Sequence, residues 1–304
     1  MCAGKDSACP QEEDMEQMRR LAVVPIAMLI LAACQGAALT NVVCVGEATT
    51  YLDWLNGDFQ PDEPEPIEEP ADTSGDLLEI IQERGTLIVS TDPNYEPQSF
   101  LEADGTFVGF DIDVATEIAT RLGVEIAFET PEWDAITAGS WSERWDISVG
   151  SMTITTPRKE ALSFTRPYYF TPASVAVAES AGIDDIADLP FELPEGGEAT
   201  TLPTDSNCAE AIEAGREEFS LWVSSETTID SAIERGLPLV KIPPEEPIFT
   251  ENLAVAIDKS GPPHAALLFE IDRIIGEMHE DGTLTALSQE WFEADLTQDP
   301  VASQ

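Results

Sequence analysis

The sequence predicts an α/β protein of two lobes, and two observations support this. A strand, a helix and a second strand follow one another over residues 86–128, which is the pattern of a βαβ unit. Two later strands, at 174–178 and 252–257, bracket a separate α/β segment. One lobe is therefore expected to be inserted into the other, with two crossings between them. A chain of 304 residues is long enough to give each lobe a buried core.

The elements of the first lobe follow from apolar spacing and from glycines that end helices. A short helical pattern begins at residue 77 and stops at Gly85, and Phe110–Leu122 carries apolar residues at helical spacing before Gly123. The other elements expected here are strands at 86–90, 124–128 and 146–149 and a helix near Ala135.

The same patterns set the expected domain boundaries. The first lobe covers residues 77–177, the second covers 178–253, and residues 254–297 return to the first lobe. The return segment carries two amphipathic helices, 265–278 and 283–292, which are expected to pack back on the first lobe.

Residues 1–34 have the pattern of a leader that contains a lipoprotein signal peptide. Arg19 and Arg20 precede the apolar residues 21–33, which are too few to span a bilayer as a helix. The segment ends in Leu-Ala-Ala-Cys, which resembles the bacterial lipoprotein cleavage box. This predicts a lipid on Cys34 that anchors the protein outside the cytoplasmic membrane. The alternative is a short buried helix, but the arginine pair argues against it.

Acidic residues dominate the chain and its predicted linker. Lys and Arg number 14 against 59 Asp and Glu, so the formal net charge is −45. Nucleic acid and anionic membrane surfaces would repel such a chain, and neither is an expected partner. High salt would relieve its self-repulsion. Residues 60–76 contain four prolines, seven acids and no base, which predicts an extended linker.

The cysteines and histidines predict no metal site and no cofactor. No Cys-x-x-Cys occurs, and the two histidines have no partner at metal-binding spacing. Of the five cysteines, only Cys44 and Cys208 follow the predicted lipidation site. Export permits a disulfide between them, and two buried free thiols are the alternative.

A set of motifs stands in order between residues 77 and 297: Gly85–Tyr95, Gly109–Asp113, Trp133, Ser151–Arg158, Phe164–Tyr168, Asp281–Leu284 and Trp291. Together they resemble the solute-binding proteins of polar amino acid ABC importers, extracellular family 3. The resemblance implies the type II fold of periplasmic binding proteins, in which each lobe is a central sheet flanked by helices and two hinge crossings join the lobes. It also implies a small ligand, most simply an amino acid, and a permease partner on which the closed form docks.

Arg158 is the first candidate for ligand binding. Its planar guanidinium can meet a carboxylate with two parallel hydrogen bonds. The resemblance adds the Thr153 hydroxyl as a second donor to that carboxylate and the Ser151 carbonyl as an acceptor for the ligand's ammonium group. The alternatives are a surface ion pair for Arg158 and local backbone capping for Thr153.

Three further candidates come from the same motifs. The resemblance implies that Tyr95 and Trp133 sandwich the ligand side chain and that Asp92 is an acid at the cleft. Aromatic rings give a large contact area at low entropic cost. Otherwise Tyr95 and Trp133 are core residues and Asp92 shapes a turn before Pro93.

Two features depart from the family pattern. Relatives carry a strand and Gly-Thr-Thr in the second lobe, whereas here the matching sequence, residues 41–59 with Thr49 and Thr50, precedes the first lobe. This displaced segment is expected to insert into the second lobe; the alternative is an incomplete lobe. Relatives also carry an ammonium-binding Asp in a later strand, where this chain has Ser224 or Ser225. A neutral hydroxyl cannot supply that charge.

The predicted function is an extracytoplasmic lipoprotein that captures an amino acid or similar small carboxylate and delivers it to an ABC importer. The alternative is a small dehydratase-type enzyme on the same fold. Such an enzyme requires a positioned general acid or base, and the cleft offers only Asp92 and Glu132. A binding protein without catalysis is therefore expected.

Overall fold

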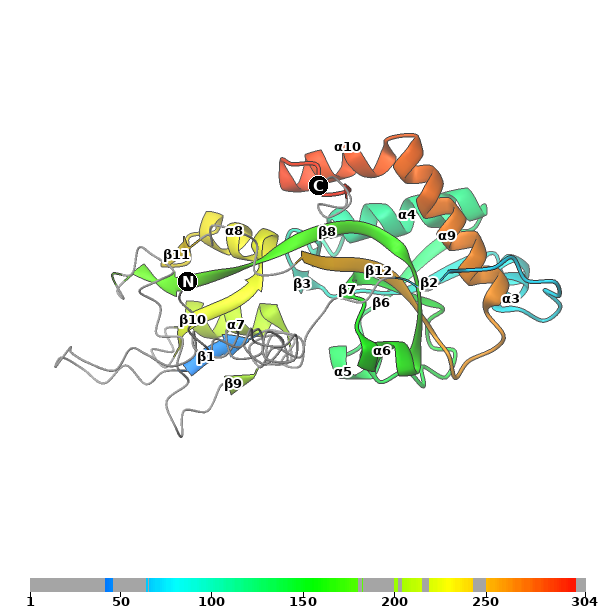
Figure 1. Cartoon of the computed structure of the whole chain (residues 1–304), viewed down its shortest axis with the longest axis horizontal. Helices are drawn as coiled ribbons and strands as arrows, with labels where there is room; N and C mark the ends of the chain where they lie inside the picture. Colours follow the sequence, from blue (N-terminus) through cyan, green and yellow to red (C-terminus); the bar gives the residue numbers. More distant parts are fainter. Residues whose placement is uncertain are drawn as a thin grey trace, which may run out of the picture.

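The computed structural model describes residues 42–45, 64, 66–179, 182, 200–201, 204–214, 219–242 and 250–298. Its two lobes lie side by side and share one long mixed sheet (Figure 1). The strand order is β6-β2-β7-β12-β8-β10-β1-β9, with β11 also paired to β8. In that order the strands are Glu125–Glu129, Thr86–Ser90, Ile147–Thr153, Thr250–Asp258, Leu162–Ala178, Phe219–Ser225, Val42–Val45 and Thr200–Thr201, and β11 is Leu239–Ile242.

Strand β8 joins the two lobes and forms the first crossing. Up to Pro172 it pairs antiparallel with β12, and from Ala173 onward it pairs with β10 and β11. The sequence predicted a separate strand at 174–178, but these residues are the end of a 17-residue strand. The second connection runs from Ile242 in β11 to Thr250 in β12, through residues outside the described part.

Helices cover both faces of the first lobe's sheet. On one face lie α3 (Leu77–Arg84), α4 (Phe110–Leu122), α9 (Ala265–Glu280) and α10 (Thr283–Phe292), and on the other lie α5 (Trp133–Thr137) and α6 (Thr156–Ala161) (Figure 1). Each face has its own apolar cluster, the first around Ile81, Val114 and Ile271 and the second around Trp141 and Met152. The predicted bounds of α4 and α10 are confirmed.

The end of the predicted linker is held by the first lobe. The carboxylate of Asp76 accepts a hydrogen bond from the Leu78 amide at 3.0 Å and so caps α3. It also accepts from the amides of Ala266 and Leu267, at 3.0 and 3.1 Å, in the first turn of α9. One buried side chain therefore accepts hydrogen bonds from amides in the first turns of two helices, which have no partner within their own helix.

The second lobe contains the strand that precedes the first lobe in the chain. Strand β1 lies between β10 and β9 and is parallel to both. Its residues belong to the displaced segment 41–59, of which residues 41 and 46–59 lie outside the described part. Helices α7 (Asp205–Glu213) and α8 (Glu226–Glu234) pack against this sheet around Trp222.

Cys208 on α7 is fully buried and disulfide-bonded. The side chain of Cys44 lies outside the described residues, so the predicted pairing stays a prediction. Within the described part of the chain, no helix combines the length and the apolar character that a membrane span needs. The predicted signal peptide, and Cys34 with it, lies outside that part.

Candidate functional site

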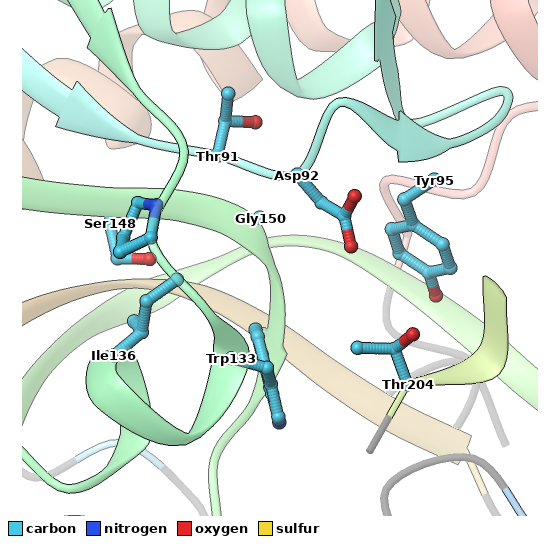
Figure 2. A pocket seen from close by; sticks show the side chains of 9 residues that line it. Thr91, Asp92, Tyr95, Trp133, Ile136, Ser148, Gly150 and Thr204 are labelled. Carbon is cyan, nitrogen blue, oxygen red and sulfur yellow. The ribbon is translucent and has the colours of Figure 1, made fainter. Parts of the chain in front are cut away.

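A pocket lies between the two lobes and contains about 460 Å³ that no protein atom fills, part of it open to solvent. Its walls are Thr91, Asp92, Tyr95, Pro131, Trp133, Ile136, Ser148 and Gly150 from the first lobe and Thr204 from the second. Figure 2 shows the carboxylate of Asp92, the ring of Tyr95 and the hydroxyl of Thr204 directed toward one another. Three of the predicted ligand-binding residues, Asp92, Tyr95 and Trp133, thus share one pocket.

Two short elements place these side chains. Asp92 follows β2, and its carboxylate accepts a hydrogen bond from the Asn94 amide at 2.8 Å, which turns the chain into β3 (Asn94–Tyr95). Strand β3 pairs with β4 (Ser99–Leu101), which pairs with β5 (Phe107–Val108). Asp92 therefore shapes a turn and also lines the pocket. Trp133 is the first residue of α5.

Arg158 is buried against the pocket wall. Its side chain is only 7% exposed, and its guanidinium carbon lies 5.4 Å from the centroid of the Trp133 ring. Nη1 donates to the Thr153 carbonyl at 2.9 Å. The hydroxyl of Thr155 caps α6 and accepts from the Arg158 amide, which fixes the backbone that carries the guanidinium. Stacking and this hydrogen bond hold the cation in place beside the pocket.

Thr153 contacts an acid that the motifs did not indicate. Its hydroxyl donates to Oε1 of Glu251 at 3.1 Å, and both residues are buried. Glu251 lies near the start of β12, opposite Thr171 of β8, at the crossing between the lobes. The sequence signal for it was a charged residue two positions before the apolar run that begins at Leu253. Thr153 does not cap a helix, because its hydroxyl points to this carboxylate.

Ser151 belongs to a buried hydrogen-bond network behind the pocket. With φ of 52° it is a non-glycine residue in the left-handed region. Its amide donates to the Tyr168 hydroxyl at 2.9 Å, and its own hydroxyl donates to Asp111 at 2.8 Å. The Tyr169 hydroxyl donates to the Ser151 hydroxyl at 2.7 Å, and the Tyr168 hydroxyl donates to the Asp111 carboxylate at 2.8 Å. This network fixes the backbone turn next to Gly150, which lines the pocket.

Burial dominates the electrostatics of this network. It raises the pKa of Asp111 to about 7, although the hydrogen bonds from Tyr168 and Ser151 act in the opposite direction. Burial also raises the pKa of both tyrosines well above the usual value, and the Asp111 charge adds to this effect. Asp111 stands in the first turn of α4, where the helix dipole favours a negative charge.

The lobes also contact each other beside the pocket, between the turn of residues 94–98 and α8. The Thr228 hydroxyl donates to the Tyr95 hydroxyl at 3.3 Å, and Gln98 Nε2 donates to Thr227 at 2.9 Å. Glu96 forms an ion pair with Arg235. These contacts join the predicted aromatic clamp directly to the second lobe.

Ser224 and Ser225 are not among the residues that line the pocket, and neither are Arg158, Thr153 and Ser151. The Ser225 hydroxyl caps α8 and contacts the hydroxyl of Thr228 at 2.7 Å. Ser224 is fully buried, and its hydroxyl has no partner among the described residues. Thr49 and Thr50 lie outside the described residues. Thr204 was missed by the sequence reasoning, although a Thr just before a helix start was a usable signal.

No group of three or more His, Cys, Asp or Glu side chains suited to a metal ion occurs in the part of the chain that the structure covers. Among the described residues, the carboxylate of Asp92 lines the pocket, and the guanidinium of Arg158 lies against Trp133 in its wall. This arrangement can pair with a small ligand that carries both signs of charge.

The comparison with known proteins decides the family. Residues 87–294 match the model of the bacterial extracellular solute-binding proteins, family 3, which is more than half of the chain. This chain belongs to that family. The resemblance drawn from the motifs is therefore confirmed, and an extracytoplasmic location fits this membership.

Curated relatives of this family-3 protein are binding proteins. The L-cystine-binding protein TcyJ of Escherichia coli strain K12 is 29% identical over 73% of this chain and 88% of its own length. A probable amino-acid ABC transporter-binding protein of Haemophilus influenzae is 26% identical, covering 74% of this chain and 91% of the relative.

Solved structures confirm the predicted type II fold of this family-3 protein. A Streptococcus pneumoniae substrate-binding protein with bound histidine matches with a TM-score of 0.64 at 21% identity, over 75% of this chain and all of the other. An ancestral amino acid-binding protein, described as a precursor of cyclohexadienyl dehydratase, matches with a TM-score of 0.60 at 27% identity. The match covers 71% of this chain and 99% of the other. The family and the curated relatives point to a binding protein rather than an enzyme.

Proposed function

We propose that this protein binds an amino acid in the pocket between its lobes and delivers it to an ABC importer. The observation that carries the proposal is Arg158, a buried guanidinium held against Trp133 beside a pocket to which both lobes contribute. The relative of this protein in Escherichia coli is named for L-cystine, and the relative in Haemophilus influenzae is named for amino acids.

The residues at the pocket match the parts of an amino acid. Removing a carboxylate and an ammonium from water is costly unless each is paired. Arg158 is the partner for the carboxylate, and Tyr95 and Trp133 offer apolar faces to the side chain. Thr204 reaches the same pocket from the second lobe, so a bound ligand contacts both lobes. Contacts to both lobes favour the closed arrangement.

Isothermal titration calorimetry with the common amino acids and L-cystine tests the proposal. We expect at least one of them to bind, and Arg158→Ala to weaken its binding by about 100-fold. Arg158→Lys should restore only part of the loss, because an ammonium lacks the guanidinium's planar fork. The control is Arg144→Ala, which removes an arginine stacked 4.6 Å from the Trp145 ring and away from the pocket. Absence of binding to every amino acid would refute the proposed function.

The dehydratase alternative is tested with the same preparation. We expect no turnover when the protein is incubated with a prephenate-like acid, because the pocket is proposed to serve binding alone. Turnover that Asp92→Asn or Glu132→Gln abolishes would instead support an enzyme with a general acid or base at the cleft.

The lipid anchor and the permease partner are also proposed. The Leu-Ala-Ala-Cys sequence that ends at residue 34 supports cleavage before Cys34 and attachment of lipid to it. Expression in bacteria with a labelled fatty acid should place the label on the wild type and not on Cys34→Ala. Equal labelling of the two proteins would contradict the anchor.

A further inference from the structure

We infer that Asp111 is a positioning residue for the ligand pocket, because it holds Ser151 in a strained backbone conformation next to Gly150. The inference rests on the proposed function and deepens it, since it names a residue on which affinity depends without contact to the ligand. Gly150 lines the pocket, whereas Asp111 is fully buried and is not among the lining residues. An effect of Asp111 on the ligand is therefore expected to pass through Ser151.

Strand β7 bulges where it reaches the pocket. Ala254 of β12 pairs with Met152 and Ala256 pairs with Ser148, so one residue of β12 lies opposite three residues of β7, which form the bulge 149–151. Gly150, at the centre of the bulge, lines the pocket (Figure 2). A bulge bends the strand and changes the direction in which its side chains point. The conformation of the bulge therefore sets the position of this part of the pocket wall.

Ser151 ends the bulge in a conformation that serine disfavours. Its φ is 52°, in the left-handed region, where the Cβ atom lies too close to the following carbonyl oxygen. This close approach reduces the population of the left-handed conformation by a factor of about 5 to 30, whereas glycine has no Cβ and adopts positive φ readily. Ser151 therefore keeps this conformation because contacts from the rest of the fold hold it there.

Asp111 holds Ser151 directly by its side chain and, through Tyr168, by its backbone. The two carboxylate oxygens of Asp111 accept hydrogen bonds from the hydroxyls of Ser151 and Tyr168, each at 2.8 Å. The Tyr168 hydroxyl in turn accepts the Ser151 amide at 2.9 Å, and the Tyr169 hydroxyl donates to the Ser151 hydroxyl at 2.7 Å. All four residues are buried, which strengthens these hydrogen bonds.

A double-mutant cycle on ligand affinity tests whether Asp111 acts through Ser151. Asp111→Asn has one acceptor oxygen in place of two, so either the Ser151 or the Tyr168 hydroxyl loses its acceptor. We expect this change to weaken binding by about 5- to 30-fold when residue 151 is serine, because fewer molecules then keep the left-handed conformation. With Ser151→Gly in the background, the same change should weaken binding by no more than about threefold, since glycine adopts that conformation readily.

The dissociation constants are measured by calorimetry at pH 8, above the pKa of about 7 that burial gives Asp111. The probe is whichever of the common amino acids and L-cystine binds the wild type most tightly. Asp113→Asn is the matched control, because Asp113 lies in the same first turn of α4 and accepts the Trp291 Nε1 at 2.7 Å instead. It should change the affinity by less than about twofold in both backgrounds.

Two results would overturn the inference while the proposed function stands. An equal loss of affinity from Asp111→Asn in both backgrounds would show a structural role that is independent of Ser151. Unchanged affinity in both backgrounds would show that the bulge keeps its conformation without Asp111.

A second pair of variants keeps the test decisive if Asp111→Asn does not fold. Ser151→Ala and Ser151→Gly both remove the hydroxyl that Asp111 accepts, and only the alanine variant keeps a Cβ atom. We expect the glycine variant to bind at least about threefold more tightly than the alanine variant. Equal affinities of these two variants would overturn the inference, whereas failure of every amino acid to bind the wild type would refute the proposed function itself.

Discussion

At the scale of single residues, Asp111 makes stability depend on pH. Its pKa rises from 3.8 to about 7 on folding, mainly because it is buried. The folded protein then binds more protons than the unfolded chain between these values, so the free energy of unfolding falls as pH rises from about 4 to about 7. The total is on the order of 4 kcal/mol. This pH dependence is the reverse of that of a salt-bridged Asp, for which the free energy of unfolding rises with pH in the acidic range.

Asp111→Asn tests this dependence, because it removes the ionisation and keeps the side-chain size. We expect the variant to lose stability less steeply than the wild type between about pH 4 and about pH 7, as measured by urea unfolding. The groups that face Asp111 are Ser151 and Tyr168, with Tyr169 one hydrogen bond away. If the free energies of unfolding of the two proteins change in parallel with pH, Asp111 does not titrate in this range.

Sequence reasoning identified the charged and aromatic side chains that line the pocket, Asp92, Tyr95 and Trp133, and missed a buried contact set by tertiary pairing. Tyr95 and Trp133 line the pocket because their motifs sit at strand and helix ends. Glu251 was missed because its contact with Thr153 depends on the register in which β12 pairs with β7. Ser225 was predicted at the ligand, and its hydroxyl caps α8, so its role toward a ligand stays a prediction. Residue type alone does not distinguish a cap from a ligand contact.

At the scale of elements, Asp76 joins the starts of α3 and α9. Its carboxylate accepts three backbone amides, and it is 3% exposed. Asp76→Ala leaves these amides without an acceptor, so we expect the free energy of unfolding to fall by about 2–3 kcal/mol. Asp72→Ala is the control, because Asp72 is exposed and its carboxylate accepts hydrogen bonds from the neighbouring Ser74. Equal, small losses in urea unfolding for both variants would contradict the double cap.

Local signals predicted helices better than the longest strand. Gly85 and Gly123 take φ of 73° and 75° at helix ends, which is why the ends of α3 and α4 could be recognised. Only the last part of β8, residues 174–178, was predicted as a strand, and the earlier part contains prolines, which are uncommon inside strands. Here Pro167 stands where the β12 pairing shifts register, opposite Ala254. The length of β8 depends on its pairing with three partner strands, β10, β11 and β12, and no local sequence pattern reveals this pairing.

At the scale of the whole molecule, chain order and spatial order differ. Strand β1 precedes the first lobe in sequence but lies between β10 and β9 of the second. The Gly-Glu-Ala-Thr-Thr sequence at 46–50 recurs at 197–201, and this repeat is a sequence signal of the displacement. The sequence pattern identified this segment as strand-forming. Which strands lie next to it depends on pairing across the sheet, and such pairing does not require that the strands follow one another along the chain.

The net charge of −45 predicts that salt stabilises the whole protein. With 14 basic residues against 59 acids, repulsion outweighs the ion pairs that salt also weakens. Raising NaCl from about 0.1 M to about 1 M shortens the screening length from about 10 Å to about 3 Å. We expect Tm in scanning calorimetry to rise by about 4 °C or more, which corresponds to about 1–2 kcal/mol for a chain of this size. Choline chloride should act like NaCl, since the effect is screening rather than binding of sodium. A Tm that falls or stays constant over this range would show that self-repulsion does not limit the stability of the fold.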